Sequence, residues 1–306
     1  MSVNYHAYQC RDFLMSDYEE IYLQWQKAFE NYDPERVCRI LNLKRDAAFV
    51  YVEYLHTLFR IHLKTGRIEK QLNQEETIAD QVRNAFRKSL SHAENRIKQQ
   101  SLFREIVEIL QNPTQGKQNL PKGSSYLKLN DRDATDPGTL AARCRKIMEE
   151  ENGWTDQVYF NEGMAVYHLL SYVKDNPQLS GQWIPNTNLD PRTGKGNPKE
   201  ELLFTEFADL FADHTELLHL ACRENHGTEI SSKADLAYQF DVFPQVSVQL
   251  QFYDRDEEFP AQAQIFVDRR ITDFVHIETT GCMVSDLFEK LIYSTFVKKE
   301  NGICNP

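Results

Sequence analysis

Val246-Ser-Val-Gln-Leu-Gln-Phe-Tyr-Asp-Arg-Asp-Glu-Glu-Phe-Pro260 is the stretch of this chain that decides the fold. Apolar and polar residues alternate from Val246 to Tyr253, which is the period of a strand buried on one face. A connector rich in carboxylates follows, and the alternation resumes at Ala263 and ends at Asp268. The stretch therefore predicts a β-hairpin with an acidic connector.

Working outward, most of the other elements are predicted by helical spacing. Asp33-Pro34 has the form of an N-cap followed by proline at the first helical position. Residues 48–54 and 58–63 are β-branched and aromatic, and they predict a strand pair. Apolar residues at helical spacing predict further helices over 18–29, 75–111, 138–151, 159–173, 203–221 and 284–292. Strands near both ends with helices between them are typical of an α+β fold with a mainly antiparallel sheet and long amphipathic helices packed against it.

Composition excludes several classes of function. The six cysteines are widely spaced with no Cys-x-x-Cys pair, which argues against zinc and iron-sulfur sites, so no metal site is predicted. A net charge of -11 argues against nucleic acid, and the short apolar runs argue against a membrane span. The surplus of basic residues between Arg60 and Arg104 fits either a solvated helix face or a surface for an anionic partner. We expect a soluble, cytoplasmic protein.

The acidic connector is the first candidate for chemistry. Asp254 and Asp256 are candidate catalytic carboxylates, and Glu257 and Glu258 are candidate ligand-binding residues. Carboxylates paired at a strand end are suited to general acid-base catalysis or to binding a hard cation. Acidic residues are also common in hairpin connections, where solvation and protection against edge pairing explain most such clusters.

Other candidate site residues lie on both sides of the connector. Trp183 and Phe259 would supply apolar contacts to a ligand, and Asp268 would orient it. His276 would be the catalytic partner of the connector carboxylates. We expect these residues to converge on one pocket, whereas His214, on the apolar stripe of its predicted helix, is expected to be a core histidine.

Three segments carry a resemblance to a known family. They are Asp33-Pro-Glu-Arg-Val-Cys-Arg-Ile-Leu-Asn-Leu43, Leu179-Ser-Gly-Gln-Trp-Ile-Pro185, and Phe243 to Asp268 with His276-Ile-Glu-Thr279. These residues, above all Asp256-Glu-Glu-Phe-Pro260, resemble a prokaryotic domain-of-unknown-function family, number three-seven-eight-six. The resemblance spans residues 33–291, with 70–157 as an insertion relative to shorter members.

The resemblance implies an anaerobic setting but no specific activity. Because some members are fused to a cysteine-rich iron-sulfur domain of the kind seen in corrinoid proteins, it implies a link to corrinoid or one-carbon metabolism. This sequence does not contain the cysteine pattern of such a domain.

The chain is expected to divide into three parts. Residues 1–69 would form N-terminal helices and a strand pair, residues 70–157 an inserted helical region whose loop 114–136 is mobile, and residues 158–306 an α+β part that completes one core with 33–69. Two functions follow as hypotheses. The first is a non-redox accessory protein that binds a small molecule or a protein partner, with its cofactor unknown. The alternative is an enzyme that uses a carboxylate of the Asp254 to Glu258 cluster as its general base.

Overall fold

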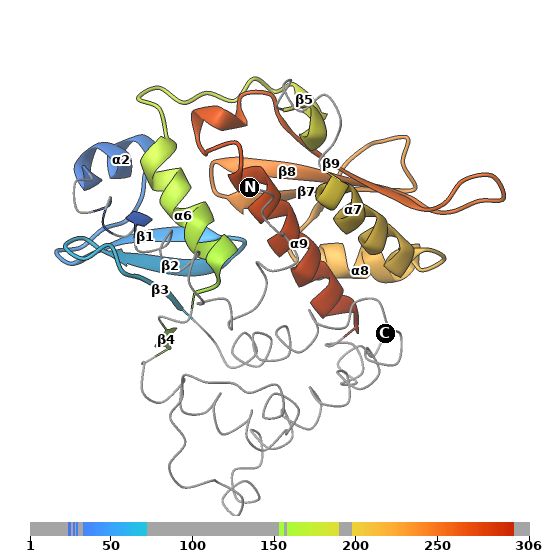
Figure 1. The fold of residues 1–306 in the computed structure, drawn as a ribbon, viewed down its shortest axis with the longest axis horizontal. Coiled ribbons are helices and arrows are strands. Elements are labelled where there is room, and N and C mark those ends of the chain that lie inside the picture. The colour runs from blue at the N-terminus through green and yellow to red at the C-terminus, as the bar shows by residue number, and fades with distance from the viewer. Residues whose placement is uncertain are drawn as a thin grey trace, which may run out of the picture.

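A computed structural model describes residues 33–71, 153–155, 158–189 and 198–296, together with residues 24, 25, 27 and 29 (Figure 1). Within these ranges the chain forms a four-stranded and a five-stranded sheet, both antiparallel, with helices lying over them. The predicted α+β class is confirmed.

The first sheet has the order β1-β2-β3-β4. Its strands are β1 (Phe49–Tyr54), β2 (Thr57–His62), β3 (Ile68–Gln71) and β4 (Trp154–Thr155). The helix α2 (Pro34–Leu41) precedes it, and the side chain of Asp33 accepts two backbone N–H groups at the start of that helix. The predicted N-cap and strand pair are therefore confirmed, whereas the short strands β3 and β4 were not predicted.

The second sheet has the order β5-β9-β8-β7-β6. Its strands are β5 (Trp183–Pro185), β6 (Thr228–Glu229), β7 (Leu236–Phe243), β8 (Val246–Tyr253) and β9 (Gln262–Asp268). Buried and half-buried residues alternate along all of β8, and Phe252 pairs with Ala263 across the β8–β9 hairpin. The predicted hairpin and its register are confirmed.

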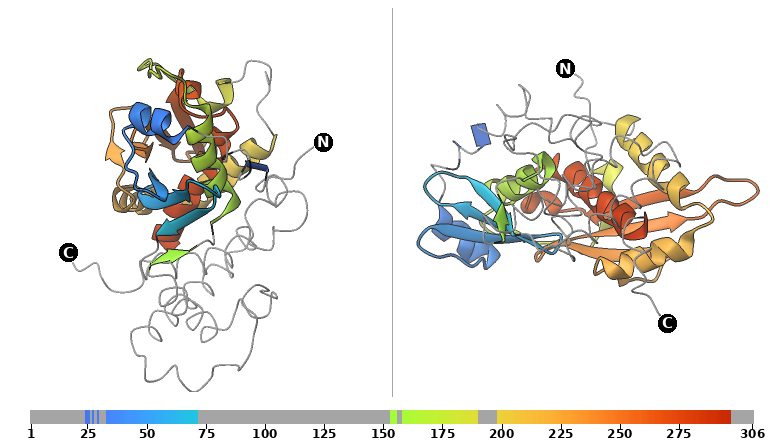
Figure 2. Two further views of the ribbon diagram at one scale, coloured as in Figure 1. Left: turned by 90° about the vertical axis from the view of Figure 1, so that its left-hand side faces the viewer. Right: turned by 90° about the horizontal axis from the view of Figure 1, so that it is seen from below.

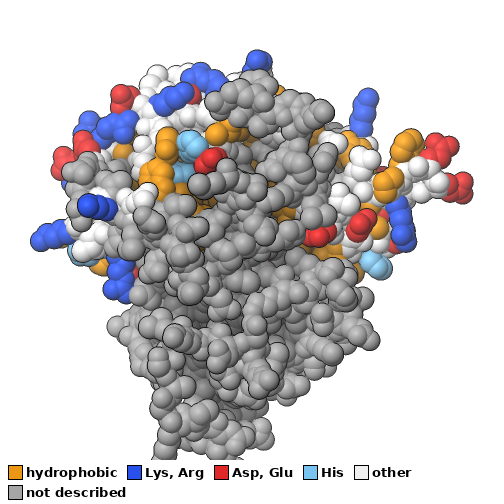
Figure 3. Space-filling view, in the orientation of Figure 1, with side chains coloured by type: hydrophobic (Ala, Val, Ile, Leu, Met, Phe, Trp, Pro, Cys, Tyr) orange, Lys and Arg blue, Asp and Glu red, His pale blue; other side chains and the backbone are white. Residues whose placement is uncertain are grey.

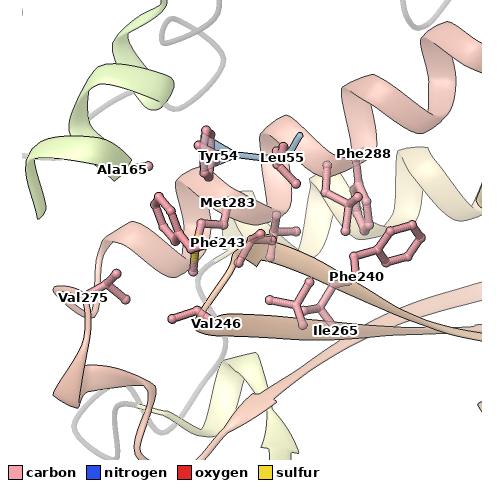
Figure 4. Close-up of a cluster of buried hydrophobic side chains, with 14 of the residues drawn as sticks. Tyr54, Leu55, Ala165, Phe240, Phe243, Val246, Ile265, Val275, Met283 and Phe288 are labelled. Atoms are coloured by element: carbon pink, nitrogen blue, oxygen red, sulfur yellow. The ribbon is translucent and has the colours of Figure 1, made fainter. Parts of the chain in front are cut away.

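The two sheets share one hydrophobic core. The N–H of Leu55, in the turn between β1 and β2, donates to the Val242 carbonyl of β7 at 2.9 Å. The rings of Tyr54 and Phe243 lie 4.9 Å apart beside this link. Figure 4 shows these two rings together with Met283 and Phe288, which come from the opposite layer. Burial of such large apolar side chains is the main term that stabilises the joined sheets.

Helices form the layer over the strands. They are α6 (Phe160–Tyr172), α7 (Pro198–Phe211), α8 (Thr215–Glu224) and α9 (Thr279–Phe296). Figure 2 shows α6, α9 and α7 on the same side of the strands, with α9 between the other two. Residues 161–170 of α6 are all buried, so this helix is enclosed on every side.

One predicted helix is in fact two. The helix expected over 203–221 breaks after Phe211, because Asp213 adopts a φ of +61°, outside the helical region. His214 becomes the N-cap residue of α8 and is exposed. The expectation that His214 is a buried core histidine is therefore wrong.

Several predictions lie outside the described residues. They are the helices over 75–111 and 138–151, the loop 114–136 and most of the helix over 18–29. The division into three parts with an inserted region stays a prediction for the same reason. In the portion of the chain that the structure describes, no helix combines the length and the apolar character needed to cross a bilayer.

Candidate functional site

Asp254 holds the loop between α7 and α8. Its Oδ1 accepts the N–H of Asp213 at 2.9 Å, and its Oδ2 accepts the hydroxyl of Thr215 at 2.7 Å. Its own N–H donates to Asp235 at 2.8 Å. Both carboxylate oxygens of Asp254 are thus occupied at the point where α8 begins.

The rest of the acidic connector is a tight turn. Oδ1 of Asp256 accepts the N–H groups of Glu258 at 2.8 Å and of Phe259 at 2.7 Å. The side chains of Glu257 and Glu258 are exposed, and Phe259 is 60% exposed. This geometry is that of an Asx turn, in which an aspartate satisfies local backbone donors.

Asp268 lies at the opposite end of β9 from the connector. Trp183 of β5 is its cross-strand partner. Oδ1 of the buried Asp268 accepts from the N–H and the hydroxyl of Ser180, both at 2.9 Å, and Oδ2 accepts the N–H of Gly181 at 2.7 Å. Burial acts to raise the pKa of Asp268, but these bonds and one from the Arg270 N–H outweigh it and lower that pKa. Asp268 therefore anchors the segment that leads into β5.

The expected convergence of these residues on one pocket is not found. Trp183 and Asp268 are brought together, but they lie at one end of β9 and the connector lies at the other end. At about 3.3 Å per residue that separation is about 20 Å. Figure 1 shows the β8–β9 connector as a loop that projects away from the helices. The functional roles predicted for these residues stay predictions.

His276 instead lies in a group of rings on the other layer, which we call the histidine cluster: Trp25, His168, Tyr172 and His276. The ring centroids of His276 lie 5.3 Å from His168 and 4.7 Å from Tyr172. Trp25 contacts His168 at 4.7 Å and Tyr172 at 5.8 Å. Figure 3 shows histidine atoms at the surface among hydrophobic side chains, between the end of α6 and the start of α9.

The cluster runs from solvent into the interior. Tyr172 is 40% exposed and the His276 side chain is 31% exposed, whereas His168 is only 4% exposed. Below them, Nδ1 of His168 and Oγ1 of the fully buried Thr279 share a hydrogen bond of 2.7 Å. Burial, with a smaller effect of His276, lowers the pKa of His168 to about 4, so its imidazole is neutral at pH 7.

The orientation of His276 is set by its own loop. The N–H of Glu278 donates to Nδ1 of His276 at 3.3 Å. Because Nδ1 accepts this bond, the neutral ring carries its proton on Nε2. His276 therefore offers a hydrogen-bond donor to any group that approaches its free edge.

Buried polar contacts continue along the α6–α9 interface beyond Thr279. Asp286 of α9 accepts the hydroxyl of Tyr54 at 3.0 Å and the amide of Asn161 at 3.4 Å. Burial, and next the charge of Asp286, raise the pKa of Tyr54 well above its ordinary value. One turn from Asp286 the thiol of Cys282 also has a raised pKa, first because of burial and then because of Asp286 and Glu278, so it stays protonated and unreactive.

A buried ion pair joins α6 to the four-stranded sheet. Nζ of Lys70 on β3 lies 3.1 Å from Oε2 of Glu162 on α6, and both side chains are buried. The ammonium also lies 4.4 Å from the ring centroid of Tyr159. Such a pair positions elements, because loss of either partner leaves a buried charge without its counter-ion.

Metal ligation is not indicated by this geometry. Within the described ranges, no three His, Cys, Asp or Glu side chains are grouped so that they could hold a metal ion. Cys38, Cys222 and Cys282 are free thiols.

Of the histidine cluster, sequence reasoning found only His276. His168 and Tyr172 were missed, as was the hydrogen-bond partner of His168, Thr279, although α6 itself was predicted. A histidine inside the otherwise apolar run from Met164 to Leu170 was the available signal.

Comparison with known families gives one result. Residues 141–289 match the family described as Domain of unknown function (DUF3786). The matched range contains α6, the β8–β9 hairpin and the histidines of the cluster, but not the Asp33 motif, so the expected span from residue 33 is only partly covered. No curated protein and no solved structure matches the chain. The suspected resemblance is confirmed, because residues 141–289 match the model of that same family.

Proposed function

We propose that this chain is a cytoplasmic ligand-binding accessory protein whose site is the histidine cluster. The observation that carries the proposal is the ring contact of the buried, neutral His168 with the partly exposed His276 and Tyr172. A planar group can stack on the exposed rings, and Nε2 of His276 can donate a hydrogen bond to it. Apolar walls with a few placed polar groups are the usual composition of a small-molecule site.

The interior contacts support binding rather than simple core packing. A core histidine needs only a partner such as Thr279, and His168 has that partner. It does not need a second imidazole and an exposed tyrosine packed against its outer face. The bond to Thr279 and the close packing of α6 on α9 fix the ring of His168, so the surface that it supports is preorganised.

A corrinoid is one ligand to test, because the family resemblance implies that link. A corrinoid could bind by coordination of its metal to a histidine nitrogen or by stacking of its ring system. Coordination through Nδ1 of His276 would require that atom to release the N–H of Glu278. The geometry therefore favours a ligand that accepts a hydrogen bond over one that is coordinated.

The alternative, an enzyme with a general base in the Asp254 to Glu258 cluster, has less support. Asp254 and Asp256 each accept backbone N–H groups, and Asp254 also accepts the Thr215 hydroxyl. A carboxylate that orders a turn has lost acceptor positions that a base would use on a substrate. Glu257 and Glu258 are exposed and stay candidates for contact with a partner.

A thermal-shift screen followed by calorimetric titration tests the proposal. The panel contains cobalamin, flavins, nucleotides and aromatic acids, applied to the parent protein and to three variants. His276→Ala and Tyr172→Ala should each weaken binding of a hit by tenfold or more. The double variant E257Q/E258Q, which changes the connector only, should bind as the parent does. A hit that the connector variant abolishes and His276→Ala leaves intact would favour the alternative.

A further inference from the structure

A pair of cations adjoins the histidine cluster. Lys174 follows Tyr172 by two residues, and its Nζ lies 2.6 Å from Oδ1 of Asp273. Nη2 of Arg270 lies 2.5 Å from Oδ2 of the same carboxylate. The Lys174 N–H also donates to the Asp273 carbonyl at 2.9 Å, which fixes the two segments side by side. We call Lys174, Arg270 and Asp273 the ion group.

The ion group has more donors than its carboxylate can accept. An ammonium has three N–H donors and a guanidinium five, whereas a carboxylate offers about four acceptor positions. Oδ2 of Asp273 also takes a backbone N–H from Gln178 at 3.4 Å. The carboxylate is buried, but the side chain of Lys174 is 59% exposed and that of Arg270 is 47% exposed. Surplus donors and one surplus positive charge therefore lie at the surface.

The buried carboxylate of Asp273 is ionised and orders the two cations. Burial acts to raise the pKa of Asp273, but its bonds to Lys174 and Arg270 prevail and lower that pKa. The carboxylate is thus ionised at neutral pH and holds both cations in place before any ligand arrives. Cations that are already positioned lose little side-chain freedom on binding an anion.

The ion group lies within reach of a molecule bound at the rings. Lys174 is two positions from Tyr172 and Asp273 is three positions from His276, so the chain limits both Cα–Cα distances to about 10 Å. Val173, between Tyr172 and Lys174, is buried while both neighbours are exposed, so the two side chains project to the same surface. In Figure 3, Lys and Arg side chains gather along the edge of the molecule next to the histidines.

Other charged side chains lie near this surface. Arg36 pairs with the exposed Asp175 at 2.6 Å and donates to the Val173 carbonyl at 3.0 Å. Glu278 is 75% exposed and lies 3.7 Å from Nδ1 of His276. Asp175 is matched by Arg36, so two cations still face one carboxylate at the ion group itself, and Glu278 is an exposed anion beside His276.

From this geometry we infer that the ligand of the histidine cluster is an anion with a planar aromatic group. Its ring stacks on Tyr172 and His276, and its carboxylate or phosphate binds Lys174 and Arg270. Nε2 of His276 donates a further bond to the same ligand. This inference rests on the proposed function, because it assigns a ligand class to that site. Charge-assisted bonds from a guanidinium are well suited to carboxylate and phosphate groups.

Matched pairs of ligands test the inference by calorimetry. The probes are 2-naphthoate with 2-naphthamide, adenosine monophosphate with adenosine, and flavin mononucleotide with riboflavin. We expect at least one anion to bind tenfold or more tightly than its neutral partner. Lys174→Gln and Arg270→Gln should each lower the affinity for that anion about tenfold, which is the usual effect of losing one charged hydrogen bond. The affinity for its neutral partner should not change.

Control variants separate a local effect from misfolding. Lys174→Arg and Arg270→Lys keep the charge and should retain most of the affinity. Lys233→Gln removes an exposed cation beside β7 and should leave binding unchanged. Single variants are used because either remaining cation still neutralises Asp273.

Three results would overturn the inference: no anion binds, neutral partners bind equally well, or Lys174→Gln and Arg270→Gln bind anions as the parent does. If His276→Ala abolishes binding of a neutral ligand while the cation variants have no effect, the proposed function stands and this inference falls. If the cation variants lower the affinity for an anion but His276→Ala and Tyr172→Ala do not, the rings are not the binding site. Both the proposed function and this inference would then be wrong.

Discussion

Nδ1 of His168 and Oγ1 of Thr279 lie 2.7 Å apart, although 111 positions separate these residues in the sequence. The contact joins the middle of α6 to the first residue of α9. It holds the inner ring of the histidine cluster in place. The orientation of the His168 ring therefore depends on this bond.

Thr279→Val should destabilise the fold by about 1–3 kcal/mol, the range for leaving one buried polar partner unsatisfied. Valine has nearly the same shape as threonine, so packing is kept while the hydroxyl is lost. Thr279→Ser keeps the hydroxyl and is the control, with a smaller loss. Urea unfolding measures both, and equal midpoints for Thr279→Val and the parent would show that the bond contributes nothing.

The stability of the protein should fall as the pH falls from about 6.5 to about 4. The pKa of His168 is about 4 in the folded state, against an ordinary value of 6.5. Above pH 6.5 both states are neutral at this residue, but between these values only the unfolded state binds the proton. The shift is equivalent to about 3 kcal/mol, lost progressively across that window.

His168→Asn isolates this effect, because it removes the titrating group. Unfolding free energies measured at steps from pH 7 to pH 4 should decline more steeply for the parent than for the variant. Asp268 and Asp273, whose pKa values are lowered from 3.8, lose their contributions only at still lower pH. Parallel curves for parent and variant would contradict the assignment.

Asp254→Ala should destabilise the protein by about 1–2 kcal/mol, because the N–H of Asp213 and the hydroxyl of Thr215 lose their acceptor. Glu257→Gln and Glu258→Gln, which change exposed side chains, should stay within about 0.5 kcal/mol of the parent. Chemical unfolding compares the three. An Asp254→Ala variant as stable as the parent would remove the structural explanation of this carboxylate and reopen its catalytic role.

Two matched substitutions test which side chains of β8 face the core. Leu250→Asp places a charge in the core and should destabilise by several kcal/mol, whereas Gln249→Asp on the half-buried face should cost under about 1 kcal/mol. Similar urea midpoints for the two variants would be inconsistent with the register.

Local patterns were sufficient to predict much of the fold. The alternation along β8 is a property of eight consecutive residues, and Asp33-Pro34 marks a helix start through its own side chain and ring. The break between α7 and α8 was missed because it depends on a positive φ at Asp213. Aspartate adopts that conformation often enough that no pattern in the surrounding sequence requires or excludes it.

The site was harder to predict, for two physical reasons. The close spacing of carboxylates in the connector suggested a functional role. In the structure, however, the backbone N–H groups of neighbouring residues donate to Asp256. His168 is on a helix buried all round, so periodicity does not distinguish the side that faces α9. Its partners Thr279 and His276 are brought to it by tertiary packing alone.

The central claim, that the histidine cluster binds the ligand, is tested most directly by nuclear magnetic resonance of the imidazole nitrogens. Signals of His276 and His168 can be assigned with His276→Gln and His168→Asn, and a hit from the ligand screen is then added to saturation. We expect the His276 signals to shift most, those of His168 to shift less, and those of the exposed His214 not to move. A bound ligand that leaves His276 and His168 unchanged would contradict the claim.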